Sequence, residues 1–212
     1  MKTLILKEKK ILLSDIILVG FSIFFASLIY IGLLEFNFHS ILIYFSISAT
    51  NLLLLAASMN YEKTFKSEYL LNSLPINKKD IILARYIVTI IFTIIITLFF
   101  VFNVLIMGSI LLGANMMFRL IDIKDIIIAI SLVLILASFT IPLYYSKFSK
   151  VINTIFLIPM GLLLGSYLNI NIGEFIFLLK KPLGLIILLV AALLLYYFSY
   201  GLSKKIYINK EF

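Results

Sequence analysis

Few side chains of this chain could carry out covalent or metal chemistry. The sequence contains one histidine, His39, and no cysteine, so neither a His pair nor a cysteine set is available to bind a metal ion. Asp15 and Glu35 fall near opposite ends of the first apolar segment, within reach of water, whereas a proton relay needs ionisable groups at mid-depth. No segment matches G-x-x-x-x-G-K-[ST], the loop whose backbone N–H groups bind phosphate. The sequence therefore predicts no catalytic residue, no metal site and no ATPase activity in this chain.

The residues best suited to recognition lie in a polar insert between two apolar segments. Residues 60–74, NYEKTFKSEYLLNSL, are predicted to form a short amphipathic helix, because aromatic residues recur at every fourth position. Tyr61, Phe65 and Tyr69 form one stripe, whereas Glu62, Lys63, Lys66 and Ser67 occupy the other faces. The aromatic stripe suits either burial among lipid headgroups or docking into a groove of a cytoplasmic partner, and composition alone does not decide between them.

A sharp turn is predicted to follow the insert, at Leu74, Pro75 and Asn77. Pro75 ends the helix because it lacks an N–H donor and its ring clashes with the preceding turn. Asn77 is a suitable N-cap, with Asp80 three residues later in a capping-box-like position, so a new helix is predicted to begin at Lys78.

Polar residues are sparse in the apolar segments. The candidates for lining a translocation pathway are Asn51, Thr89, Thr93, Thr97 and Asn103. The three threonines share one helix face, but intramembrane threonines also bond their own i−4 carbonyl or join helices, so both interpretations stay open. Gly161 and Gly165, in GLLLG, indicate close helix packing, either within the chain or between two protomers.

The elements that position these residues are membrane-spanning helices. The 212 residues are 63% hydrophobic and only 13% charged, which is too little charge for a water-exposed surface. We expect an all-α, polytopic membrane protein with a single domain over residues 1–212. The six predicted spans are about 14–34, 41–59, 82–108, 126–145, 151–169 and 183–202. The third apolar run is longer than one crossing needs, and Gly108 and Gly113 predict that its surplus, within 105–121, breaks off as an outer interfacial or re-entrant piece.

Orientation follows from the 18 Lys and Arg residues. With six spans, all but four of them fall on one side of the membrane, and cytoplasmic loops are the ones enriched in these residues. The four on the opposite side are Arg119, Lys124, Lys180 and Lys181. Both termini and the insert are therefore predicted to be cytoplasmic, and the net charge of +8 reflects topology rather than nucleic-acid binding.

The run from Tyr61 to Tyr86, YEKTFKSEYLLNSLPINKKDIILARY, resembles the cytoplasmic loop of bacterial ABC transporter permeases of the type-2 exporter class. Members of that class share an acidic-aromatic helix, a Ser-Leu-Pro-aliphatic turn, a basic pair and an aliphatic helix with a Lys/Arg-aromatic step. The matching positions are Ser73-Leu74-Pro75-Ile76, Lys78-Lys79, Ile81-Ile82 and Arg85-Tyr86. A weaker match is IPLYYSKFSK at 141–150, with Ser149 where relatives often have glycine.

The resemblance implies that the 60–74 helix is a coupling helix seated on a separate ABC ATPase subunit, which would bind ATP and Mg²⁺. It implies that this helix faces the ATPase with Tyr61, Glu62, Phe65, Lys66 and Tyr69. This chain would hold no cofactor and would export an amphipathic or apolar substrate, such as a peptide, drug or lipid, from a bacterial plasma membrane. Six spans would form half of a typical pathway, so a second permease subunit is expected, identical or related. The membrane subunits of phenol-soluble-modulin and antimicrobial-peptide exporters are similar small permeases.

Three other functions compete with export. An immunity or assembly factor with the permease fold would share every feature above. A six-helix substrate-capturing uptake subunit would need a polar ligand pocket but not this insert. An intramembrane protease would need paired mid-membrane acids, a metal set or a Ser–His pair, none of which the sequence offers.

Overall fold

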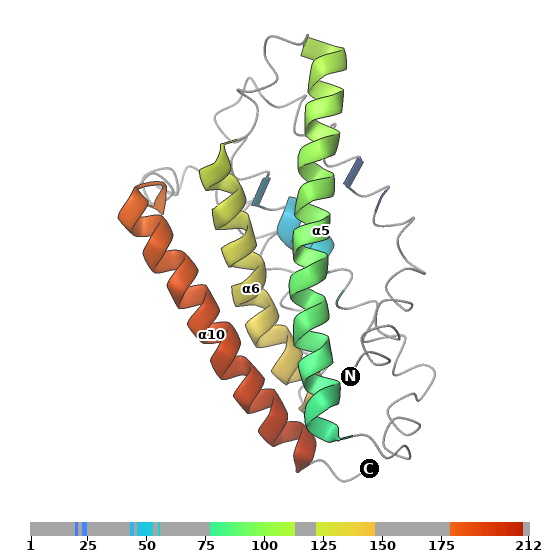
Figure 1. Ribbon diagram of the computed structural model, residues 1–212, viewed down its shortest axis with the longest axis vertical. Coiled ribbons are helices and arrows are strands. Elements are labelled where there is room, and N and C mark those ends of the chain that lie inside the picture. The colour runs from blue at the N-terminus through green and yellow to red at the C-terminus, as the bar shows by residue number, and fades with distance from the viewer. Residues whose placement is uncertain are drawn as a thin grey trace, which may run out of the picture.

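The computed structural model describes residues 77–112, 122–146 and 179–209, with short pieces at 20, 23–24, 43–44, 46–52 and 55. Three long helices make up most of this part of the chain: α5 (Lys78–Leu112), α6 (Ile123–Tyr145) and α10 (Pro182–Ile208) (Figure 1). Each is long and apolar enough to cross a membrane. They confirm the third, fourth and sixth predicted spans. The fifth span, both termini and the 60–74 helix lie outside the described residues, and the first two spans are described only in the pieces named above.

Each of the three helices begins at a residue suited to that position. The side chain of Asn77 accepts a hydrogen bond of 3.1 Å from the N–H of Lys79, which confirms the predicted N-cap and the start of α5. Asp122 caps α6 in the same way, accepting from Lys124 N–H at 3.0 Å. Pro182 opens α10, where its missing N–H costs nothing because a first-turn N–H has no helical partner.

The third span does not break at Gly108, and a break at Gly113 stays a prediction because that residue lies outside the described ones. The helix α5 continues through Gly108 to Leu112, a length of 35 residues. Glycine breaks helices in water, where solvent competes for the backbone, but in lipid an unpaired N–H or C=O is too costly to expose. At 1.5 Å per residue α5 is about 52 Å long, against a hydrocarbon core of about 30 Å, so it must tilt or project from the core. Residues 113–121 lie outside the described residues.

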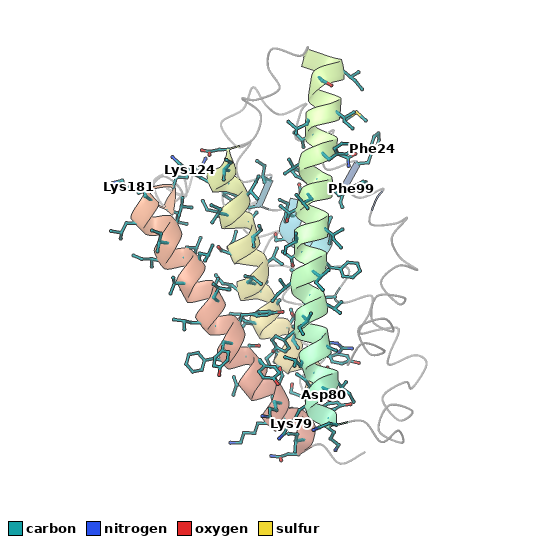
Figure 2. All side chains as sticks on the ribbon, viewed as in Figure 1. Phe24, Lys79, Asp80, Phe99, Lys124 and Lys181 are labelled. Atoms are coloured by element: carbon teal, nitrogen blue, oxygen red, sulfur yellow. The ribbon has the colours of Figure 1, made fainter. Side chains whose placement is uncertain are left out.

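The directions of the three helices agree with the predicted topology. The helix α5 runs opposite to α6 and α10 (Figure 1). Figure 2 shows Lys79 and Asp80 at one end of the helices and Lys124 and Lys181 at the other. The helix ends predicted to be cytoplasmic therefore gather together, and so do those predicted to be outside. We call these two ends the inner and outer ends.

The helix α6 lies between α5 and α10 in this view, and it packs most extensively against α10. One core cluster, toward the inner end, contains Ile82, Ile141, Tyr207 and Leu55. A second cluster, toward the outer end, contains Ile43, residues of α5 from Val88 onward and residues of the earlier half of α6. The described residues of the second predicted span therefore pass from the outer cluster at Ile43 to the inner cluster at Leu55, the direction that its place in the chain requires.

Candidate functional site

The predicted contacts with an ATPase lie outside the described residues, as does most of the turn that follows them. They are Tyr61, Glu62, Phe65, Lys66, Tyr69, Leu74 and Pro75. The glycines Gly161 and Gly165 also lie outside. The described chain resumes at Asn77, so the first turns of α5 are where the insert joins the helices.

Arg85 is a residue of α5, and its side chain is buried between helices. The distribution of Lys and Arg had counted its charge with those of the cytoplasmic side. Arg85 is 3% exposed. Its guanidinium carbon lies 4.9 Å from the ring centroid of Tyr144 and 5.4 Å from that of Tyr145, both at the end of α6. A planar cation is attracted to the negative face of an aromatic ring, and this attraction strengthens when water is excluded. Arg85 thus joins α5 to α6 at the inner end.

The same aromatic group extends to the last turns of α10. The rings of Tyr145 and Tyr207 meet edge-on, with centroids 4.9 Å apart. Tyr207 is 1% exposed. Edge-to-face geometry brings the positive ring edge of one tyrosine toward the negative face of the other. Because Tyr207 is held in this way, α10 stays helical and packed beyond the predicted end of its span at about residue 202.

Tyr86, the residue after Arg85, joins α5 to α10 by hydrogen bonds. Its hydroxyl lies 2.6 Å from Ser199 Oγ and 2.8 Å from Ser203 Oγ. The hydroxyl of Tyr196 donates to the backbone carbonyl of Tyr86 at 2.8 Å. The Tyr86 ring also meets Tyr196 and Tyr200 edge-on, at centroid distances of 4.9 and 5.5 Å. One residue of α5 is therefore held by one face of α10 through both polar and aromatic contacts.

Ser199 also connects α10 to α6. Its hydroxyl donates a 2.6 Å hydrogen bond to the backbone carbonyl of Ser138. Pro142 stands four residues after Ser138 inside α6 and has no N–H to donate to that carbonyl. A buried carbonyl without a partner would be destabilising in a membrane, and Ser199 supplies the donor that proline cannot. The proline therefore creates an acceptor that a neighbouring helix uses.

The predicted pathway threonines are buried, and each bonds to its own helix. The hydroxyls of Thr89, Thr93 and Thr97 donate to the carbonyls four residues earlier at 2.9, 2.8 and 2.7 Å. The amides of Asn51 and Asn103 do likewise, each at 2.8 Å. These are the bonds that the alternative interpretation expected. A role in lining a pathway stays a prediction.

An ionic cluster joins three segments at the outer end of the helices. Asp125, in the first turn of α6, is 2% exposed. One oxygen, Oδ1, accepts from Tyr44 OH at 2.6 Å and lies 2.8 Å from Lys180 Nζ. Tyr44 belongs to the second predicted span, and Lys180 immediately precedes α10. The carboxylate, favoured at a helix N-terminus by the helix dipole, therefore joins three separate segments.

The contacts of Tyr86 and Arg85 at the inner end and of Asp125 at the outer end were not predicted from the sequence. One signal was readable: the inward residues of α10 recur at i, i+3, i+4, i+7 and i+11, as Tyr196, Ser199, Tyr200, Ser203 and Tyr207. That spacing places them on one helix face. The partners of this face, Tyr86 and Ser138, could not be read, because they lie far away in the chain.

Antiparallel span-length helices, apolar outer faces and buried polar side chains define a multi-pass helical membrane protein. The chain belongs to the ABC-2 family of transporters: the family model described as "ABC-2 family transporter protein" matches residues 3–208. No curated protein and no solved structure matches the chain. Family membership makes it a membrane component of an ABC transporter, a generally non-catalytic subunit that associates with an ABC ATPase.

Proposed function

We propose that this chain is the permease subunit of an ABC exporter that moves an amphipathic or apolar substrate, such as a peptide, drug or lipid, out of a bacterial cell. The observation that carries the proposal is the family match over residues 3–208. The absence of a phosphate-binding loop from the sequence assigns ATP and Mg²⁺ to a partner subunit. That partner would dock on the 60–74 helix.

The described helices support an amphipathic or apolar substrate. The buried threonine hydroxyls of α5 already donate to their own helix. Such a surface offers little to a strongly polar solute, which would need fixed donors and acceptors to replace its water. An amphipathic or apolar substrate needs fewer, as in the phenol-soluble-modulin and antimicrobial-peptide exporters that the chain resembles.

A complete transporter would contain a second permease subunit, identical or related, because six spans supply half of a typical pathway. The outer faces of α5 and α10 carry large exposed apolar side chains, among them Leu98, Phe102, Leu183 and Phe198. Apolar faces of this kind suit lipid or another membrane helix equally.

Purification of the tagged chain from native membranes in mild detergents tests the proposal. We expect an ABC ATPase to co-purify in stoichiometric amount, and ATP with Mg²⁺ to change the conformation of the complex. Export is then measured by comparing how much substrate accumulates in cells with the chain and in cells without it. A complex without an ATPase in several detergents would contradict the proposal. A complex that hydrolyses ATP, protects cells and exports nothing would favour an immunity role.

A further inference from the structure

We propose that Tyr86 is the positioning residue that passes movement of the cytoplasmic insert from α5 to α10 and α6, through one directed chain of hydrogen bonds. The inference rests on the proposed function, because it supposes that an ATPase moves the insert. It assigns a role to a residue that contacts neither substrate nor nucleotide.

The direction of the hydrogen bonds follows from counting protons. A serine hydroxyl has one proton, and that of Ser199 is donated to the carbonyl of Ser138, which can only accept. In the 2.6 Å bond between Tyr86 and Ser199, Tyr86 must therefore be the donor. The single proton of Tyr86 is then used, so Ser203 must donate in the 2.8 Å bond. The order is Ser203 to Tyr86 to Ser199 to the carbonyl of Ser138.

These hydrogen bonds connect residues on all three helices. Ser203 and Ser199 lie on α10, Tyr86 on α5 and Ser138 on α6. Tyr86 is 3% exposed, Ser199 3% and Ser203 0%. Bonds that point the same way polarise one another, and water is excluded from competing for them. The inner ends of the three helices are therefore expected to move as one body.

The position of Tyr86 along α5 connects this body to the insert. The helix starts at Lys78, directly after its N-cap Asn77 in the predicted turn, and Tyr86 lies in its third turn. A straight helix transmits a displacement over this distance with little loss, since each backbone bond resists bending. Arg85 adds the contact to Tyr144 and Tyr145 on α6. A push or rotation at Asn77 thus reaches α10 through Tyr86.

Two environment-sensitive fluorophores test the inference in the full complex with its ATPase. The chain has no cysteine, so single cysteines can be labelled without background. One replaces Lys79 at the start of α5, and another replaces Leu202 on α10, which is 58% exposed. In the otherwise unchanged protein, ATP with Mg²⁺ should alter both signals with the same rate constant.

Tyr86→Phe removes both hydroxyl bonds and keeps the ring. We expect the Lys79 probe to respond as before. The ratio of the Leu202 response to the Lys79 response should fall by up to about eightfold, the change in an equilibrium constant that corresponds to losing two membrane hydrogen bonds. Ser199→Ala should produce the same separation, because it removes the link to Ser138. Tyr197→Phe is the matched control, since Tyr197 is on the same helix and 72% exposed; it should change neither probe.

Three results would overturn the inference. If Tyr86→Phe and Ser199→Ala lower only the thermal midpoint and leave the ratio of the two responses unchanged, Tyr86 has a structural role alone. If the control variant separates the probes as strongly, the effect is not specific to this chain of bonds. If the ATPase is absent from the complex, or ATP leaves the Lys79 probe silent in the unchanged protein, the proposed function fails first and the inference fails with it.

Discussion

Lys180 Nζ lies 2.8 Å from Asp125 Oδ1, and this ion pair joins α6 to the start of α10 at the outer end of the helices. The side chain of Asp125 is 3% exposed and that of Lys180 25%. The lysine side chain is therefore partly exposed, whereas the carboxylate side chain is buried. Tyr44 donates to the same carboxylate oxygen. The second span is thus held at the same point.

Removing the lysine should destabilise the protein. Lys180→Ala leaves a buried carboxylate with Tyr44 as a remaining donor, and we expect a loss of about 1–3 kcal/mol in the free energy of unfolding, reduced from the fully buried case by the exposure of the lysine. Unfolding of the purified protein in detergent, followed by circular dichroism, measures the change. Lys181→Ala removes the neighbouring exposed lysine and is the control. Equal losses in the two variants would show that the ion pair contributes nothing.

Arg85 and Tyr144 should be energetically coupled. The guanidinium carbon lies 4.9 Å from the ring centroid, and a desolvated contact of this kind is worth about 1–2 kcal/mol. A double-mutant cycle with Arg85→Met and Tyr144→Leu isolates the pair from other contacts of each residue. We expect a coupling energy of about 1 kcal/mol. Additive effects would mean that Arg85 is buried for another reason.

Whether Thr89, Thr93 and Thr97 line the pathway can be tested with substitutions that preserve the fold. Thr93 donates to the carbonyl of Thr89, which already has its helical N–H partner, so Thr93→Val should change stability by about 0.6 kcal/mol or less. If the stripe lines the pathway, as the sequence predicts, export should nevertheless fall severalfold. Transport assays at equal expression levels give the answer. Unchanged export in the Thr89, Thr93 and Thr97 valine variants would leave the hydroxyls with helix bonding alone.

The insert should bind the ATPase through its aromatic stripe. Phe65→Ala removes a predicted anchor, and truncating such an anchor typically costs about 2 kcal/mol, or more than tenfold in affinity. Complex formation and export should fall together while the membrane helices stay folded. Lys66→Glu should change the salt dependence of association without abolishing it. A photocrosslinker at position 65 that captures lipid alone would contradict docking.

Topology is tested by cysteine labelling of intact cells with a membrane-impermeant reagent. A cysteine at Lys181 should react from outside, whereas cysteines at Lys79 and Lys66 should react only after the cells are opened. The expectation follows from the distribution of Lys and Arg, which favours the cytoplasmic side. Reaction of the Lys66 position in intact cells would reverse the assignment of the inner end.

The membrane class, the three described spans and the start of α5 at Asn77 could be predicted from sequence because each depends on local chemistry. Length and apolarity decide whether a helix can cross a bilayer, and a capping side chain acts on N–H groups two or three residues away. The continuation of α5 through Gly108 was not predicted, because a single glycine makes a break possible but is also tolerated inside a helix.

The tertiary structure alone decided the partners of Tyr86, Arg85 and Asp125. Tyr86 and Ser203 are separated by 117 residues, and Tyr44 and Asp125 by 81. No periodicity within one helix specifies which neighbour its polar face will meet, because that depends on how separate helices pack. Pro142 illustrates both contributions. Its position in the sequence leaves the carbonyl of Ser138 without a helical donor, whereas the packing of α10 against α6 brings Ser199 to donate to that carbonyl.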